Sequence, residues 1–154
     1  MNELQAIEST YTQLATDLDR KLDDARQRGS QSAIDWAEKQ QLINDSAYFI
    51  LVWGQLEAKI NGVCEKAIRK HRKSVSWRAR RAWDAHDPDN IRAKFEDRAA
   101  LVLDRFNTQS DAYRKTIRYY NQRNQVAHGK SLATGINVPF VITEIYQIIS
   151  ELRD

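Results

Sequence analysis

The sequence predicts an all-α fold, a bundle of about five to six helices. Only 5 Gly and 2 Pro occur in 154 residues, which leaves little material for the tight turns of a β-protein. Apolar residues recur at gaps of three and four over most of the chain, as on one face of a helix. The length fits one domain, residues 1–154, with a covering N-terminal helix in 1–29 and the core in 30–154.

The first expected helix ends near Gly29, a residue suited to the left-handed position after a helix. One apolar stripe runs along it, formed by Leu4, Ile7, Tyr11, Leu14, Leu18 and Leu22. The second and longest helix runs from about Ser30 to Lys73, without a proline.

Every residue from Ala47 to Trp53 is apolar or aromatic, so this stretch of the second helix is expected to be covered on all sides. A small bundle achieves that poorly, whereas a dimer interface achieves it easily. We therefore predict a homodimer whose interface includes part of the segment Phe49–Ile60 and the end of the penultimate helix.

The remaining helices follow from the same periodicity. A short helix through Trp77 and Trp83 should stop before residues 84–90, and the penultimate helix should end at Gly129. Three further stripes predict helices, and they consist of Ile91, Phe95, Val102 and Phe106, then Tyr113, Ile117, Tyr120 and Val126, and finally Phe140, Ile142, Ile145, Ile149 and Leu152.

Composition argues against several classes of protein. The one cysteine, Cys64, stands in an apolar stretch, so no disulfide or cysteine-rich metal framework is expected within one chain. The start of the chain, MNELQAIEST, lacks the features of a signal peptide, and no apolar run approaches the roughly 18 residues of a membrane span. We expect a cytoplasmic protein without membrane contact, cofactor or metal. Asp84, His86, Asp87 and Asp89 could in principle bind a metal ion, but we interpret them as turn residues.

Charge is unevenly distributed along the chain. Residues 2–46 hold nine acids and five Lys or Arg, and the rest holds 12 acids and 19 Lys or Arg. The run Lys66–Arg81 has eight Lys or Arg among sixteen residues and no acid. It is either a solvated helix end or a phosphate-binding surface, and in the second case the expected RNA contacts are Arg78, Arg80 and Arg81.

The segment YYNQRNQVAHG places Arg123 five residues before His128, with Asn124 directly after the arginine. Spacing alone is weak support for a site, because Arg81 and His86 repeat it by chance. The neighbours favour the second copy, which reads R-N-x-x-A-H-G.

This pattern, near the end of the penultimate helix of an all-α chain of this size, resembles the HEPN superfamily, and the resemblance covers the chain from about Ser30 onward. It implies a HEPN-like bundle that forms a two-fold dimer, with one Arg-x4-6-His motif from each chain at the active site. It also implies a ribonuclease toxin or phage-defence effector, with RNA as substrate and an antitoxin or defence-system partner that restrains it.

Helix geometry agrees with a shared site. Five residues at 100° each separate Arg123 and His128 by about 140° around the helix and by about 7.5 Å along its axis. Asn124 and His128, four residues apart, share a face. One motif is therefore incomplete, whereas a two-fold axis beside the helix would gather two histidines and two arginines.

The residue types suit metal-independent cleavage of RNA. A histidine exchanges protons near neutral pH, so His128 can take the proton of a ribose 2′-hydroxyl. The fork of Arg123 can stabilise the charge on the phosphate, and the product would be a 2′,3′-cyclic phosphate. The alternative for the pair is a histidine that caps a helix and an exposed arginine.

Two further positions bear on the family. In several ribonuclease members the helix facing the motif carries a Glu near its middle, and by this resemblance Glu57 would orient His128 or its copy in the partner chain. The alternative is a surface glutamate paired with Lys59 or Lys66. Some HEPN toxins carry a tyrosine two residues after the histidine, which a nucleotidyltransferase modifies, but here that residue is Lys130.

Two other functions compete with the ribonuclease. The first is a non-catalytic HEPN module that binds nucleotides or RNA or mediates dimerisation. The second is a helical scaffold protein, for which the motif is accidental and the patch Ala47–Trp53 is the functional interface.

Overall fold

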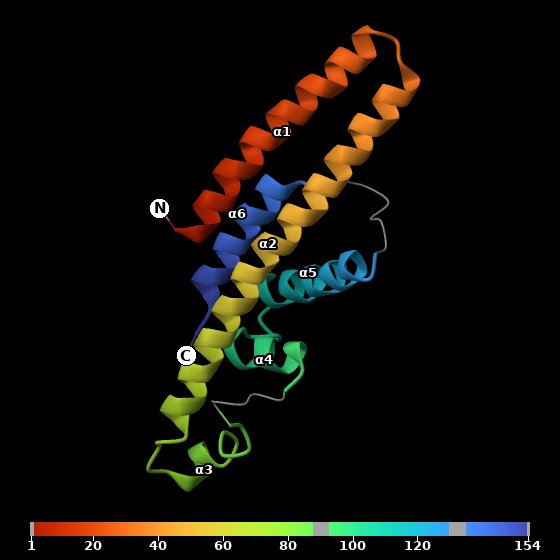
Figure 1. The fold of residues 1–154 in the computed structure, drawn as a ribbon. Helices are drawn as coiled ribbons and strands as arrows, with labels where there is room; N and C mark the ends of the chain where they lie inside the picture. Colours follow the sequence, from red (N-terminus) through yellow and green to blue (C-terminus); the bar gives the residue numbers. More distant parts are fainter. Residues whose placement is uncertain (1, 88–92, 130–134, 154) are drawn as a thin grey trace. The chain divides into compact units, whose positions relative to one another are not determined.

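The computed structural model describes residues 2–87, 93–129 and 135–153. Within these ranges there are six helices and no strand, so the all-α prediction is confirmed (Figure 1). The helices are α1 (Glu3–Gln27), α2 (Gln31–His71), α3 (Trp77–Arg80), α4 (Phe95–Val102), α5 (Ala112–Ala127) and α6 (Val138–Glu151).

The chain divides into two compact units. Unit 1 consists of Met1–Gln55 and Asn121–Glu144, and unit 2 consists of Leu56–Tyr120 and Ile145–Asp154. Helices α2, α5 and α6 each contribute a part to both units.

In unit 1, α1 and the first part of α2 form an antiparallel hairpin (Figure 1). The helix α1 starts with a capping box, in which the Asn2 side chain accepts from the Gln5 backbone N at 2.9 Å and the Gln5 side chain accepts from the Asn2 backbone N at 3.0 Å. It ends before Gly29, whose φ of 65° is the left-handed conformation that glycine adopts without strain. The predicted end of the first helix is confirmed.

The tyrosine Tyr11 joins the two helices of the hairpin. Its hydroxyl donates to the Asp45 carboxylate at 2.9 Å, and its ring meets that of Tyr48 edge-on, with centroids 5.4 Å apart. Burial raises the pKa of Asp45, and the hydrogen bond from Tyr11 partly offsets that rise. The predicted stripe on α1 is wrong at Leu14, which is 43% exposed, because α1 buries only a narrow seam against its neighbours.

The apolar stretch in the middle of α2 is covered by its own chain on one side only. Phe49, Val52 and Trp53 are buried, whereas Leu51 is 51% exposed and Ala47 is also exposed. One copy of the chain was expected to cover this stretch poorly, and its coverage by a dimer interface stays a prediction. What remains open is one face of α2.

In unit 2, the second part of α2 packs with α4, the start of α5 and the end of α6. The backbone N of Arg153 donates to the carbonyl of Val102 at 3.0 Å and so ties the end of the chain to α4. Apolar side chains fill the centre, among them Leu56, Ile60, Cys64, Ile68, Phe95, Ala99, Val102, Ile145 and Ile148.

Two apolar residues predicted to lie on buried helix faces are exposed. Helix α4 stops at Val102 because Leu103 is extended, and the Asp104 side chain then accepts from the backbone N of Phe106 at 2.9 Å, as in a turn. Phe106 is 76% exposed as a result. In α6, Phe140 is 56% exposed, whereas Ile142 is buried as expected. Val141, which the predicted stripe did not include, is buried as well.

Helix α5 buries a different face from the one its large apolar residues predict. Ala112, Thr116 and Tyr119 are buried, whereas Tyr113 and Ile117 are only half-buried. Burial of Thr116 costs little because its hydroxyl donates to the carbonyl of Ala112 at 2.8 Å. Small side chains thus decide which face of α5 packs most closely.

Candidate functional site

The predicted motif lies at the C-terminal end of α5, as the sequence indicated. His128 is the first residue beyond the helix, and its backbone N donates to the carbonyl of Asn124 at 3.1 Å. Gly129 follows with a φ of 71°, and its N donates to the carbonyl of Val126 at 3.0 Å. This glycine-dependent ending places the histidine directly after the C-terminal turn of the helix.

Arg123 reaches around the helix toward the face of His128. The two residues are five positions apart on a continuous helix, which corresponds to about 140° around its axis. Nη1 of Arg123 donates to Oδ1 of Asn124 at 3.1 Å, and Asn124 shares a helix face with His128. We call Arg123, Asn124 and His128 the Arg-Asn-His group.

The Arg-Asn-His group is open to an anion. His128 is exposed and Arg123 is half-buried. Among the residues that the structure describes, no carboxylate pairs with Arg123. The helix itself carries Arg114, Lys115 and Arg118 in addition and no acid, and Arg114 pairs with Asp111 directly before the helix.

Glu57 lies in unit 2, whereas the Arg-Asn-His group belongs to unit 1. Its Oε1 is 3.8 Å from Nη2 of Arg98, an ion pair that the sequence did not suggest. The role of Glu57 as a helper acid stays a prediction.

Arg98 is a polar centre that sequence analysis missed. Its Nη1 donates to Oδ1 of Asn61 at 2.5 Å, and its guanidinium lies 5.6 Å from the centroid of the Phe95 ring. A signal was present, because Arg98 stands three residues after Phe95 and four before Val102, and so close to the predicted apolar stripe. These contacts, together with its ion pair to Glu57, give Arg98 a structural role within unit 2.

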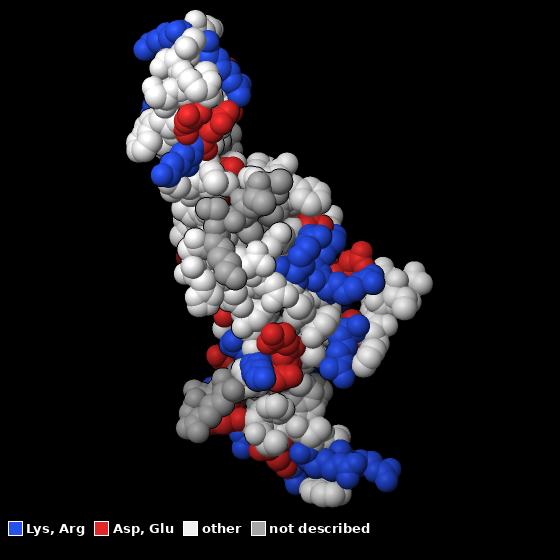
Figure 2. Space-filling model, turned by 90° about the vertical axis from the view of Figure 1, so that its right-hand side faces the viewer, with Lys and Arg blue, Asp and Glu red and all other residues white. Residues whose placement is uncertain are grey.

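The three arginines predicted to bind phosphate lie on or directly after α3, which is a single turn. Arg80 is engaged, since its Nη1 donates to the carbonyl of Ser74 at 3.0 Å and its Nε lies 3.4 Å from Oδ2 of Asp84. Arg81 lies over the Trp77 ring at 5.3 Å, and both Arg78 and Arg81 are exposed. On the face drawn in Figure 2, Lys and Arg side chains gather in several separate groups with acidic side chains beside them.

Other chemistry has little support in the described parts of the chain. They hold no cluster of three or more His, Cys, Asp or Glu placed to bind a metal ion, and none of their helices is long and apolar enough to cross a membrane. Cys64 is buried, and burial raises the pKa of its thiol. The positions of Asp89 and Lys130, named in the sequence analysis, lie outside the described residues.

Comparison of the chain with protein-family models, with curated proteins and with solved structures gave no match. The resemblance to HEPN domains therefore depends on the motif and on its place in a helical chain.

Proposed function

We propose that the protein is a metal-independent endoribonuclease of the HEPN type, a toxin or phage-defence effector that acts as a homodimer. The observation that carries this proposal is the Arg-Asn-His group at the glycine-terminated end of α5. An antitoxin or another component of a defence system would restrain the enzyme.

In the proposed reaction, His128 removes the proton from a ribose 2′-hydroxyl, and the 2′-oxygen attacks the adjacent phosphorus. The bond from phosphorus to the 5′-oxygen breaks, and the His128 of the second copy returns a proton to that oxygen. The products are a 2′,3′-cyclic phosphate and a 5′-hydroxyl end. Arg123 stabilises the additional charge on the phosphate oxygens, and Asn124 holds its guanidinium through the hydrogen bond at 3.1 Å.

The open face of α2 supports association with a second copy. Ile43 is 59% exposed and Leu51 51% exposed, and Ala47 and Gly54 on the same side of the helix are exposed as well. A Cβ added at Gly54 would have no atom within 4 Å from the rest of the described residues, its own helix turn aside. Glycine in a helix interior costs about 0.5–1 kcal/mol relative to alanine, and the close approach of a second helix at Gly54 would offset that cost.

The proposal is tested by RNA cleavage. We expect His128→Ala and Arg123→Ala each to lower the cleavage rate by about 10²- to 10⁴-fold, because they remove proton transfer and charge stabilisation. Cleavage should persist in EDTA. The matched control is His86→Ala, which breaks the chance copy of the spacing and should leave the rate unchanged.

Loss of cleavage in His86→Ala, but not in His128→Ala, would mean that the other motif is the active one. If the wild-type protein binds RNA but does not cleave it under any condition, the protein is a non-catalytic RNA-binding module.

The homodimer is tested by light scattering. Leu51→Glu places a charge on the open face of α2 and should convert the dimer to a monomer with greatly reduced cleavage. Leu14→Glu is the control, because Leu14 is similarly exposed but lies on α1. A wild-type protein that is monomeric at micromolar concentration and still cleaves RNA would contradict the dimer.

A further inference from the structure

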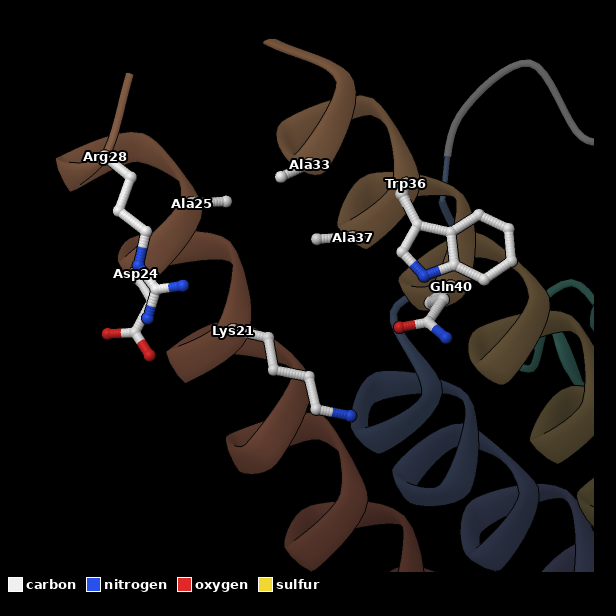
Figure 3. A pocket seen from close by; sticks show the side chains of 8 residues that line it. All are labelled: Lys21, Asp24, Ala25, Arg28, Ala33, Trp36, Ala37 and Gln40. Carbon is white, nitrogen blue, oxygen red and sulfur yellow. The ribbon is translucent and has the colours of Figure 1, made fainter. Parts of the chain in front are cut away.

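A cavity of about 420 Å³ lies in unit 1, between the last turns of α1 and the first turns of α2 (Figure 3). Its floor consists of Ala25 from α1 and of Ala33 and Ala37 from α2. Because these side chains are single methyl groups, the two helices leave a trough with an apolar floor between them. The volume is within the range of about 300–1,000 Å³ that is usual for small-molecule sites.

One wall of this cavity is aromatic and carries an amide. Trp36 projects from α2 at the edge of the trough, with its ring turned away from α1 (Figure 3). It is 60% exposed, so its own chain leaves most of the indole uncovered. Gln40 follows one turn later on the same side. An exposed indole beside an apolar floor is a surface on which a flat ring can stack.

The other wall is formed by α1 and carries two cations and one acid, namely Lys21, Arg28 and Asp24. The Lys21 side chain extends from α1 toward α2 in Figure 3. Within the described parts of the chain, neither Lys21 nor Arg28 has an ion-pair partner. Nearby, the guanidinium of Arg26 forms ion pairs with the carboxylates of both Asp23 and Glu38, each at 3.7 Å.

We propose that this cavity binds one nucleotide unit of single-stranded RNA. The base stacks on Trp36 over the alanine floor, Gln40 meets an edge of the base, and Lys21 and Arg28 hold the flanking phosphates. An apolar helix of a partner protein fits less well, because it would cover the charged side chains Lys21, Asp24 and Arg28 with an apolar surface. The inference rests on the proposed function, which makes RNA the polyanion that this protein meets, and it adds a strand-binding site formed by residues outside the Arg-Asn-His group.

The experiment uses the fluorescence of Trp36 in the full-length protein. The variant background Trp77→Phe, Trp83→Phe leaves Trp36 as the exposed indole, since Trp53 is only 1% exposed. The probe is a single-stranded oligoribonucleotide with 2′-O-methyl groups, which binds but cannot be cleaved by attack of a 2′-hydroxyl. We expect the probe to quench the emission of Trp36.

The charges are tested by a matched pair of double variants. Lys21→Ala, Arg28→Ala should weaken quenching by about tenfold or more at low salt, because two phosphate contacts are lost. Arg20→Ala, Lys39→Ala removes the same formal charge from exposed positions of α1 and α2 outside the cavity, although Arg20 also pairs with Asp17. Its affinity should stay within about twofold of the parent. Equal weakening by both double variants would overturn the proposal in favour of diffuse attraction.

The shape of the cavity is tested by Ala33→Leu, which fills the floor at an incompletely buried position and should abolish quenching while circular dichroism shows an unchanged helix content. Adenosine monophosphate is the second probe, and binding as tight as that of the oligonucleotide would overturn the RNA assignment in favour of a free nucleotide. Absence of quenching in the parent background would also overturn it. Quenching without RNA cleavage would support the nucleotide-binding site and contradict the ribonuclease. Cleavage without quenching would support the ribonuclease and contradict the nucleotide-binding site.

Discussion

The chain contains the spacing Arg-x4-His twice, and the two copies differ in the local structure around them. Arg81 and His86 follow α3, a helix of 4 residues, and the backbone N of His86 donates to the carbonyl of Trp83 at 3.0 Å within a series of turns. Arg123 and His128 occupy the end of α5, a helix of 16 residues. The same spacing therefore gives two unrelated geometries.

The neighbours of each copy explain this difference. The Arg81 side chain rests on the Trp77 ring, and the next residue, Ala82, cannot accept a hydrogen bond with its side chain. In α5 the arginine is followed by Asn124, which accepts from it, and the histidine by Gly129, whose positive φ ends the helix. A short motif therefore describes a site only where a helix of sufficient length determines the directions of its side chains.

The largest predicted effect is a loss of cleavage that persists when the residues flanking the second copy are introduced into the first. In the His128→Ala background, Ala82→Asn and Asp87→Gly would give the first copy the same flanking residues as the second. We expect no rescue, with cleavage still about 10²- to 10⁴-fold below wild type, because α3 ends before Arg81. Recovery of cleavage in a gel assay with labelled RNA would show that flanking residues, and not the helix, define the site.

The arginine of the first copy is the last residue of the basic run Lys66–Arg81, and the arginines Arg78, Arg80 and Arg81 of this run are expected to contact phosphates. Replacing Arg78, Arg80 and Arg81 by Gln should lower the slope of log affinity against log salt by about 1 to 2, since each contact with a single strand contributes about 0.7. Arg80→Gln alone should contribute least, because Asp84 already pairs with that side chain.

The salt dependence is measured by fluorescence anisotropy with an uncleavable RNA over a range of salt concentrations. Arg20→Gln on α1 is a control outside the basic run. A triple variant that keeps the wild-type slope would identify the run as a solvated helix end.

Helix boundaries could be predicted from the sequence where a single residue determines them. Gly29 and Gly129 both adopt positive φ, as their places after long periodic segments indicated. The buried face of α5 could not be predicted, because close packing there depends on Ala112 and Thr116 and not on the larger Tyr113. The size of an apolar side chain indicates only how favourable its burial would be. Whether it is buried depends on the helices packed against it.

Only part of the candidate site could be predicted from the sequence. The motif predicted the end of α5 and the shared face of Asn124 and His128, since both follow from helix geometry. The pairing of Glu57 with Arg98 joins residues 41 positions apart, and no local pattern encodes it. Sequence analysis missed the cavity beside Trp36 for the same reason, because the cavity forms only where α1 and α2 pack together with Ala25, Ala33 and Ala37 between them.

The smallest predicted effect tests the glycine that distinguishes the second copy. Gly129→Ala should destabilise the protein by about 1–2 kcal/mol, because an alanine at a φ of 71° suffers the clash of left-handed backbone. For a chain of this size that corresponds to a fall in Tm of about 2–8 °C in a thermal melt. Apart from its chain neighbours, no described residue has an atom within 4 Å of a Cβ at this position, so the loss would come from backbone conformation and not from crowding. Gly62→Ala is the control, since Gly62 lies inside α2 without a positive φ and with equal space, and it should raise Tm by about 1–4 °C. Equal shifts in the two variants would mean that Gly129 does not determine where α5 ends, and the position of His128 would then need another explanation.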